Sequence, residues 1–151
     1  MHSLVGMPSL FFRSVFRYAM TMAIAMLVAD VAFADAMCGN EERAYMEKLI
    51  NGLQPHASQV TSRGKFSATE EFGNGSMAVR ISFSENGKQL FTYRTAETGP
   101  QWGGIGARPG STKSGQPAFS FYFQQGKMGA CEANVLVKDG KFIFTPIRFV
   151  R

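Results

Sequence analysis

The strongest constraint on the fold is an alternation of apolar and polar residues that recurs after Gly64. In Ser76–Glu85 every second position is apolar, which is typical of a strand with one buried face. The Asn86-Gly87 pair that follows is a strong hairpin signal, because both residues tolerate the positive φ angles of a tight turn. It leads into a second predicted strand, Lys88–Ala96. The pattern therefore predicts an antiparallel sheet.

Four further segments are predicted as strands: Lys65–Phe72, Ala118–Gln124, Cys131–Lys138 and Lys141–Val150. Phe119, Phe121 and Phe123 share one face of their strand and are predicted to lie in the core. In the last strand the apolar phase shifts after Pro146. Since proline cannot donate to a ladder, we expect a bulge or an edge strand there. The sequence thus predicts a meander of about six strands.

One helix is predicted before the sheet. Asn40 is a good N-cap, and Gly52 and Pro55 mark the end. One stripe of the helix is apolar, whereas Glu42 falls mainly on the other side; the stripe consists of Tyr45, Met46, Leu49, Ile50 and Leu53. The predicted class is α+β, with this helix on a curved sheet or partly closed barrel. We expect residues 35–151 to form one domain, helical over 35–63 and a β-meander over 64–151.

Residues 1–34 have the pattern of a secretory signal peptide. Arg13 and Arg17 precede an apolar run, Ala19–Ala29, and Ala32-Phe33-Ala34 is a small-x-small cleavage site. The alternative is an uncleaved anchor, but the run is shorter than the roughly 20 apolar residues that span a bilayer. Met7 is an alternative start of translation. We therefore expect a periplasmic or secreted protein with no stable membrane anchor after cleavage.

Export makes a disulfide the simplest role for the two cysteines of the chain, Cys38 and Cys131. Cys38 lies just before the predicted helix, and Cys131 shares a strand face with apolar residues. The disulfide therefore requires the helix to lie on that face or at its rim.

His56 is the only histidine after residue 34, and one histidine with two distant cysteines does not form a zinc motif. We predict no metal and no cofactor.

The segment 97–117, between two predicted strands, is rich in glycine and is predicted to be one long loop. Trp102, Arg108 and Lys113 lie within it. Together they would form a binding loop, with an aromatic platform and two cations for an anionic or sugar-like ligand. The alternative is a mobile surface loop with Trp102 folded onto the core. The Gly103-Gly104-Ile105-Gly106 run lacks the strand and helix that a dinucleotide site requires.

The charge is unevenly distributed, since residues 72–151 carry ten bases and four acids. This excess either keeps the surface soluble or attracts an anionic partner. Nucleic acid is not expected for an exported chain.

No catalytic set is evident, and a hydrolase would have to rely on His56 without a nucleophile-elbow motif. We therefore predict an exported bacterial accessory or inhibitor factor that binds another protein of the envelope or exterior. Alternatives are a carrier of a small apolar ligand in a barrel-like cavity, and a hydrolase.

Overall fold

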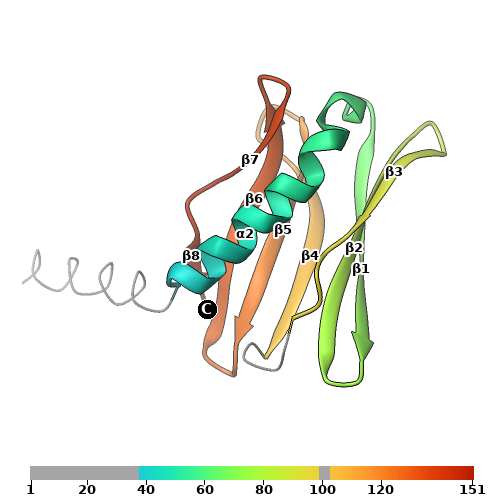
Figure 1. Cartoon of the computed structure of the whole chain (residues 1–151). Helices are drawn as coiled ribbons and strands as arrows, with labels where there is room; N and C mark the ends of the chain where they lie inside the picture. Colours follow the sequence, from blue (N-terminus) through green and yellow to red (C-terminus); the bar gives the residue numbers. More distant parts are fainter. Residues whose placement is uncertain (1–37, 99–102) are drawn as a thin grey trace, which may run out of the picture. The chain divides into compact units, whose positions relative to one another are not determined.

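The computed structural model describes residues 38–98 and 103–151 (Figure 1). The predicted signal peptide and Trp102 lie outside these residues. The described chain starts with the α-helix α2 (Asn40–Leu53) and the short 3-10 helix η1 (Gln54–Gln59), and eight strands follow. All strand pairs are antiparallel. The predicted α+β class is therefore confirmed.

The first sheet, sheet A, is a meander of three strands in the order β1-β2-β3. They are β1 (Lys65–Gly73), β2 (Ser76–Glu85) and β3 (Lys88–Arg94). Asn86 and Gly87 join β2 to β3 with φ angles of 52° and 77°, as the hairpin signal predicted. After β3 the chain continues beside β2, where Thr98 and Met77 form an isolated bridge.

The second sheet, sheet B, has five strands in the order β4-β5-β6-β7, and β8 also pairs with β6. They are β4 (Gly104–Ser111), β5 (Pro117–Gln125), β6 (Gly129–Lys138), β7 (Lys141–Phe144) and β8 (Arg148–Val150). The strand predicted over Lys141–Val150 is thus divided around Pro146. This agrees with the expected effect of a residue that cannot donate to a ladder.

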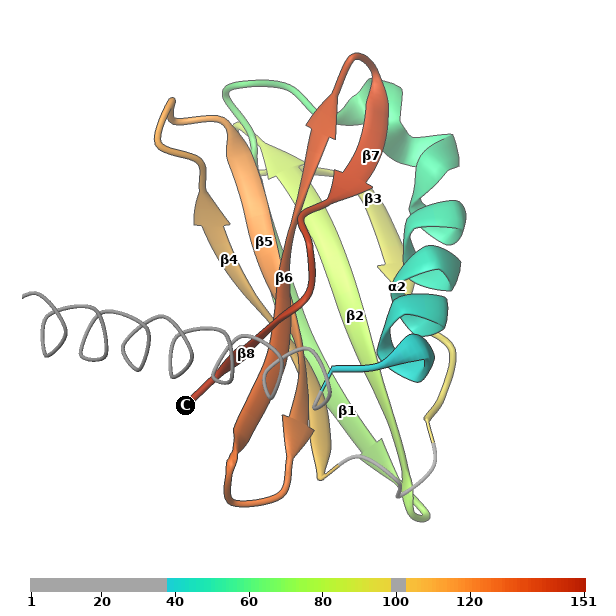
Figure 2. The ribbon, with the colours of Figure 1, turned by 90° about the vertical axis from the view of Figure 1, so that its left-hand side faces the viewer.

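Two sequence predictions about the sheet were wrong. The segment 97–117 is not one long loop, because β4 occupies its centre. Of the four β4 positions that face away from α2, three are glycine: Gly104, Gly106 and Gly110. The strand therefore lacks the usual alternation of apolar and polar side chains. The single meander is instead two open sheets, whose strands β1 and β4 lie side by side without a backbone ladder (Figures 1 and 2).

The core lies between α2 and the sheets, and a cluster of phenylalanines fills it. Phe66 of β1 is central, because its ring centroid lies 4.8 Å from that of Phe83 in sheet A and 5.1 Å from that of Phe119 in sheet B. The helix adds a buried stripe of Met46, Leu49, Ile50 and Leu53. Fully burying one such side chain contributes about 1.5–3 kcal/mol. Aromatic packing, rather than backbone pairing, therefore joins the two sheets.

The start of α2 differs from its prediction. The N-cap is Gly39, not Asn40. Glu42 is buried instead of lying on the polar side: one of its oxygens accepts a hydrogen bond from the Gly39 backbone N–H at 2.9 Å, and the other accepts one from Gln125 at 2.8 Å. The carboxylate thus links the helix start to β5. Burial of a hydrogen-bonded polar side chain of this kind cannot be predicted from a hydropathy pattern.

The predicted disulfide between Cys38 and Cys131 is present, with a Cα–Cα distance of 5.6 Å. It fastens the residue before α2 to β6. Cys131 is fully buried on the face that α2 covers, so the helix packs where the cysteine pair required. No free cysteine occurs among the described residues.

Candidate binding surface

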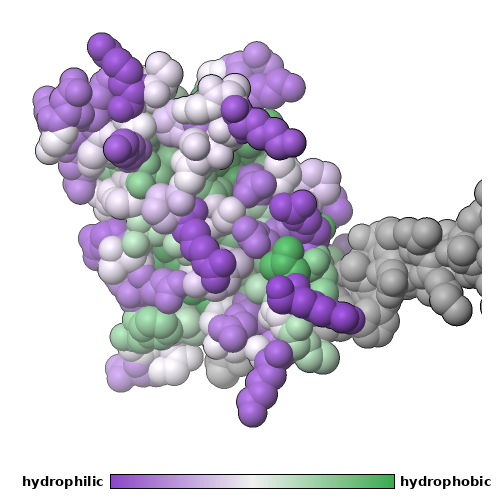
Figure 3. All heavy atoms as spheres, turned by 180° about the vertical axis from the view of Figure 1, so that it is seen from behind, coloured by the Kyte–Doolittle hydropathy of each residue, from purple (hydrophilic) through white to green (hydrophobic). Residues whose placement is uncertain are grey.

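The face of sheet B turned away from α2 is here called the outer face, and only one of the four β4 positions on it carries a side chain. The outer positions of this strand are Gly104, Gly106, Arg108 and Gly110, in register with Gln124, Tyr122, Ser120 and Ala118 of β5. The alternate positions Ile105 and Ala107 are buried in the core. Arg108 is therefore flanked on its own strand by positions without side chains. Figure 3 shows the molecule from behind, where hydrophilic side chains are interspersed with pale and hydrophobic ones.

Gly106 makes room for Tyr122 of the neighbouring strand. The Tyr122 side chain lies over Gly106, and its hydroxyl donates a hydrogen bond to Glu70 of β1. A Cβ at position 106 would collide with both the phenol and the Glu70 carboxylate. The absence of a side chain at this position thus permits a hydrogen bond from sheet B to sheet A. Burial, and secondarily the bond to Glu70, raises the pKa of Tyr122, so the phenol stays protonated as a donor.

Arg108 rests on the same tyrosine. Its guanidinium carbon lies 4.9 Å from the centroid of the Tyr122 ring, which is a cation–π contact. Arg108 is exposed, and no carboxylate of the described residues lies within the 4.0 Å that defines an ion pair. The charge is therefore oriented by the ring but not neutralised by a neighbouring acid.

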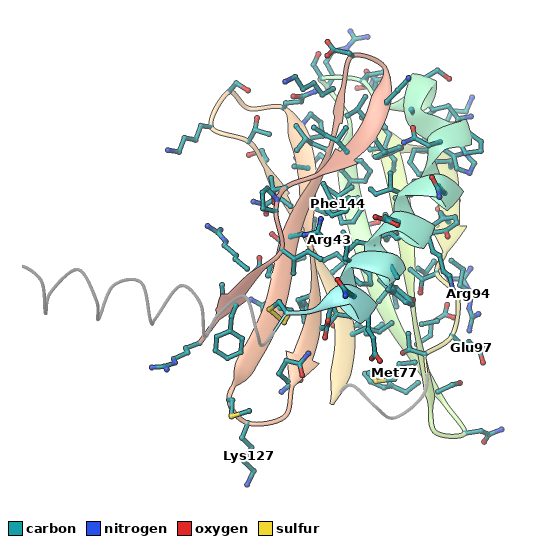
Figure 4. All side chains as sticks on the ribbon, turned by 60° about the vertical axis from the view of Figure 1, so that its left-hand side comes forward. Arg43, Met77, Arg94, Glu97, Lys127 and Phe144 are labelled. Carbon is teal, nitrogen blue, oxygen red and sulfur yellow. A yellow bond between two sulfur atoms is a disulfide. The ribbon has the colours of Figure 1, made fainter. Side chains whose placement is uncertain are left out.

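The arginines of sheet A contrast with Arg108. Glu71 forms ion pairs with Arg80 and with Arg94, each at 2.6 Å, and Arg94 also pairs with Glu97 at 3.0 Å. Figure 4 shows Arg94 and Glu97 close together. The guanidinium groups of Arg94 and Arg80 lower the pKa of Glu71. Arg80 and Arg94 are thus already paired with carboxylates, so they offer less to an incoming anion than Arg108 does.

Two open hollows adjoin Arg108. The first, here called the polar hollow, has a volume of about 280 Å³ and is lined in part by Arg108, Ser111, Ser120, Asn134, Leu136 and Thr145. Gly110 and Ala118, which are partners across β4 and β5, supply almost no side-chain volume between larger neighbours. An added Cβ at Gly110 would meet no atom within 4 Å. The polar hollow therefore arises from this pair of small residues.

The second, here called the basic hollow, has a volume of about 300 Å³ and is lined by Arg108, Tyr122, Lys127 and Arg151, among others. No aspartate or glutamate side chain lines it. Lys127 extends from the turn between β5 and β6, at the end of the molecule (Figure 4). Three cations around one depression form a region of positive potential that favours an anionic group.

The predicted site residues are only partly brought together. Arg108 lies at the junction of the two hollows, whereas Lys113 is exposed in the β4–β5 connection and lines neither of them. Trp102 lies outside the described residues. Sequence reasoning missed Tyr122, Lys127 and Arg151 as neighbours of Arg108. The alternation of glycines around Arg108 was the one sequence signal that could have indicated a strand with a single outer side chain.

His56 has contacts of a packing residue. Its ring stacks on Phe91, with centroids 4.6 Å apart and planes inclined by 10°, and Nδ1 lies 3.1 Å from Gln59 Oε1. Over the described residues, no group of three or more histidine, cysteine or acidic side chains is placed to hold a metal ion. Within the same residues, no helix is long and apolar enough to cross a membrane.

Comparison with known proteins gives no match: no protein-family model, no curated protein sequence and no solved structure matches the chain.

Proposed function

We propose that this chain is an exported, non-catalytic binding protein of the bacterial envelope or exterior, an accessory or inhibitor factor for another protein. The outer face of sheet B, centred on Arg108, would dock on an acidic surface of that partner. The observation that carries the proposal is the state of Arg108: it is exposed, it stacks on Tyr122, and no carboxylate of the described residues pairs with it.

Two features support export. Residues 1–34 have the order of charge, apolar run and cleavage site that signal peptides share. The disulfide between Cys38 and Cys131 is of a kind that forms and persists in oxidising compartments such as the periplasm. We therefore place the working protein in the periplasm or outside the cell.

The energetics of Arg108 favour an acidic partner. A carboxylate that reaches the guanidinium forms charge-assisted hydrogen bonds, which are about twice as strong as neutral ones. The Tyr122 ring already restricts the arginine, so less conformational entropy is lost on binding. The excess of bases over residues 72–151 adds long-range attraction, which raises the association rate more than the affinity.

No second function is proposed. A carrier of an apolar ligand would need its phenylalanines around a cavity, but they contact one another and the two sheets are open. For a hydrolase that relies on His56, no observation speaks in favour: the contacts of its ring are with Phe91 and Gln59.

The test compares Arg108→Ala with Arg63→Ala, which removes an equal charge from another exposed arginine, one paired with Glu85 at 3.0 Å. Binding of poly-L-glutamate is measured by titration calorimetry at several salt concentrations. We expect Arg108→Ala to weaken binding by about tenfold or more, because a hydrogen bond to a charged group contributes about 1.5–3 kcal/mol. Arg63→Ala should stay close to the parent protein. Equal losses in both variants, or binding of polygalacturonate but not of poly-L-glutamate, would contradict a protein partner.

A further inference from the structure

Several hydrogen-bond donors of the polar hollow have no acceptor among the described residues. Asn134 Oδ1 accepts from the Ser120 hydroxyl at 2.7 Å, so the amide nitrogen is the group left to donate, and no described residue accepts from it. Thr145 Oγ1 accepts from the Asn134 backbone N–H at 2.9 Å, which leaves the threonine hydroxyl hydrogen for another acceptor. Arg108 adds its guanidinium at the rim. The hollow therefore favours a ligand group that only accepts, such as a carboxylate.

The rest of the same hollow is apolar and small. Pro109, Ala118 and Leu136 contribute hydrocarbon surface to it. Its volume of about 280 Å³ is just below the range of about 300–1,000 Å³ typical of sites for drug-sized ligands. The chemistry that fits is a carboxylate attached to a short apolar body. The last residue of a peptide, with its free carboxylate and an apolar side chain, has this chemistry.

The basic hollow indicates that the carboxylate belongs to a chain rather than to a small free acid. Arg108 lines both hollows, and Lys127 and Arg151 line only the basic one. A small acid fills one hollow and leaves the side chains of Lys127 and Arg151 without a bound anionic group. A peptide that continues past Arg108 can place an acidic side chain in the basic hollow.

We infer that the partner is recognised by its free C-terminus: an apolar last residue lies in the polar hollow, its carboxylate meets Arg108, Asn134 and Thr145, and an acidic residue upstream occupies the basic hollow. This inference rests on the proposed function, since it specifies which part of an acidic partner docks on Arg108.

The test uses fluorescein-labelled peptides that end in two glutamates, a serine and a leucine, measured by fluorescence anisotropy. One peptide has a free C-terminus, a second is the C-terminal amide, and a third has glutamine for both glutamates. We expect amidation to weaken binding by about tenfold or more. Glutamine should weaken it several-fold and flatten its dependence on salt. N-acetyl-leucine, a free acid without the upstream residues, should compete far more weakly than the peptide.

A matched pair of protein variants locates the site. Gly110→Val places a side chain in the polar hollow, and Gly73→Val places one at the end of β1; an added Cβ meets no atom within 4 Å at either position. Gly110→Val should abolish peptide binding, whereas Gly73→Val should leave it unchanged. In the unmodified protein, nuclear magnetic resonance should show the side-chain amide of Asn134 shifting as peptide is added. This measurement tests the site even if Gly110→Val fails to fold.

Several results would overturn the inference without touching the proposed function. These are equal affinity for the acid and the amide, competition by N-acetyl-leucine as strong as by the peptide, an Asn134 amide that does not shift, or full binding by a folded Gly110→Val protein. In each case the Arg108-dependent binding of poly-L-glutamate would still stand. If Arg108→Ala and Arg63→Ala weakened binding of poly-L-glutamate equally, the proposed function itself would be overturned.

Discussion

Tyr122 and Gly106 face each other across β4 and β5, and the phenol of Tyr122 occupies the space that a side chain at position 106 would need. The tyrosine hydroxyl can therefore reach Glu70 on β1, although β1 and β4 share no backbone ladder. The same ring supports the guanidinium of Arg108. A position without a side chain thus determines both a link between the two sheets and the orientation of the exposed cation.

Gly106→Ala is expected to destabilise the protein. The added methyl group would collide with the Tyr122 phenol and the Glu70 carboxylate, and forced repacking of this kind costs about 1–3 kcal/mol. Urea denaturation of the purified protein measures the loss. Gly110→Ala is the control, because its Cβ meets no atom within 4 Å, and its stability should stay within about 0.5 kcal/mol of the parent. Equal stability of the two variants would show that Tyr122 does not need the space at position 106.

Removal of the disulfide is expected to lower stability while leaving the fold recognisable. The bond between Cys38 and Cys131 joins residues 93 positions apart, and such cross-links typically contribute about 2–4 kcal/mol by restricting the unfolded chain. The double variant Cys38→Ser with Cys131→Ser should show this loss in denaturant titrations. Exported protein should also contain no free thiol. Labelling of either cysteine in the folded, exported form would contradict both the disulfide and the position of the helix start.

Phe66→Ala should be among the most destabilising substitutions in the core. Phe66 is 5% exposed and contacts rings from both sheets, so its removal leaves a cavity at their junction. Phenylalanine-to-alanine changes of this type cost about 3–5 kcal/mol. Thermal unfolding followed by circular dichroism measures the change. Phe72→Ala is the matched control, since Phe72 is 69% exposed and should cost little. A small effect at Phe66 would mean that the sheets are not joined through this cluster.

Glu71 should make stability depend on pH in the acidic range. The pKa of this carboxyl is lowered by hydrogen bonds from Arg94 and Arg80. A lowered folded-state pKa means that its contribution is present above the unfolded value of 4.5 and is lost as the pH falls through the folded value. Glu71→Gln should therefore reduce the melting temperature at neutral pH and make its fall on acidification less steep. High salt should shrink the difference, because the pair is exposed.

Glu47→Gln provides the comparison for this prediction. Glu47 is exposed on α2, and no cation of the described residues lies within ion-pair distance of it. Its substitution should leave the pH profile of melting unchanged. A profile that Glu71→Gln and Glu47→Gln alter equally would exclude the network with Arg80 and Arg94 as its cause.

Strong local signals made much of the fold predictable. Alternation located Ser76–Glu85 with its exact ends, and Asn86-Gly87 specified the hairpin that follows. The cysteine pair indicated which sheet face the helix covers. Strand β4 was missed because Gly104, Gly106 and Gly110 carry no side chains that could alternate in hydropathy. Its role depends on Tyr122 and Glu70, which no local pattern associates with it.

The candidate site was predictable only at Arg108. Tyr122, Lys127 and Arg151 come from β5, from the turn after it and from the end of the chain, and the strand register brings them near β4. Asn134 and Thr145 contribute to the polar hollow for the same reason. Pairing between distant strands depends on the whole core, so local composition could not identify these neighbours. It grouped Arg108 with Lys113, which lines neither hollow, and with Trp102, which lies outside the described residues.

The most direct test of the central role of Arg108 is site-specific photocrosslinking in the exporting host. A photoreactive amino acid replaces Ser111, which is exposed beside the polar hollow, or Gln89, which is exposed on sheet A. We expect Ser111 to yield one discrete crosslinked protein, identified by mass spectrometry, that disappears when Arg108→Glu is added. The same product from Gln89, or a product from Ser111 that survives Arg108→Glu, would contradict the claim that the partner docks on Arg108.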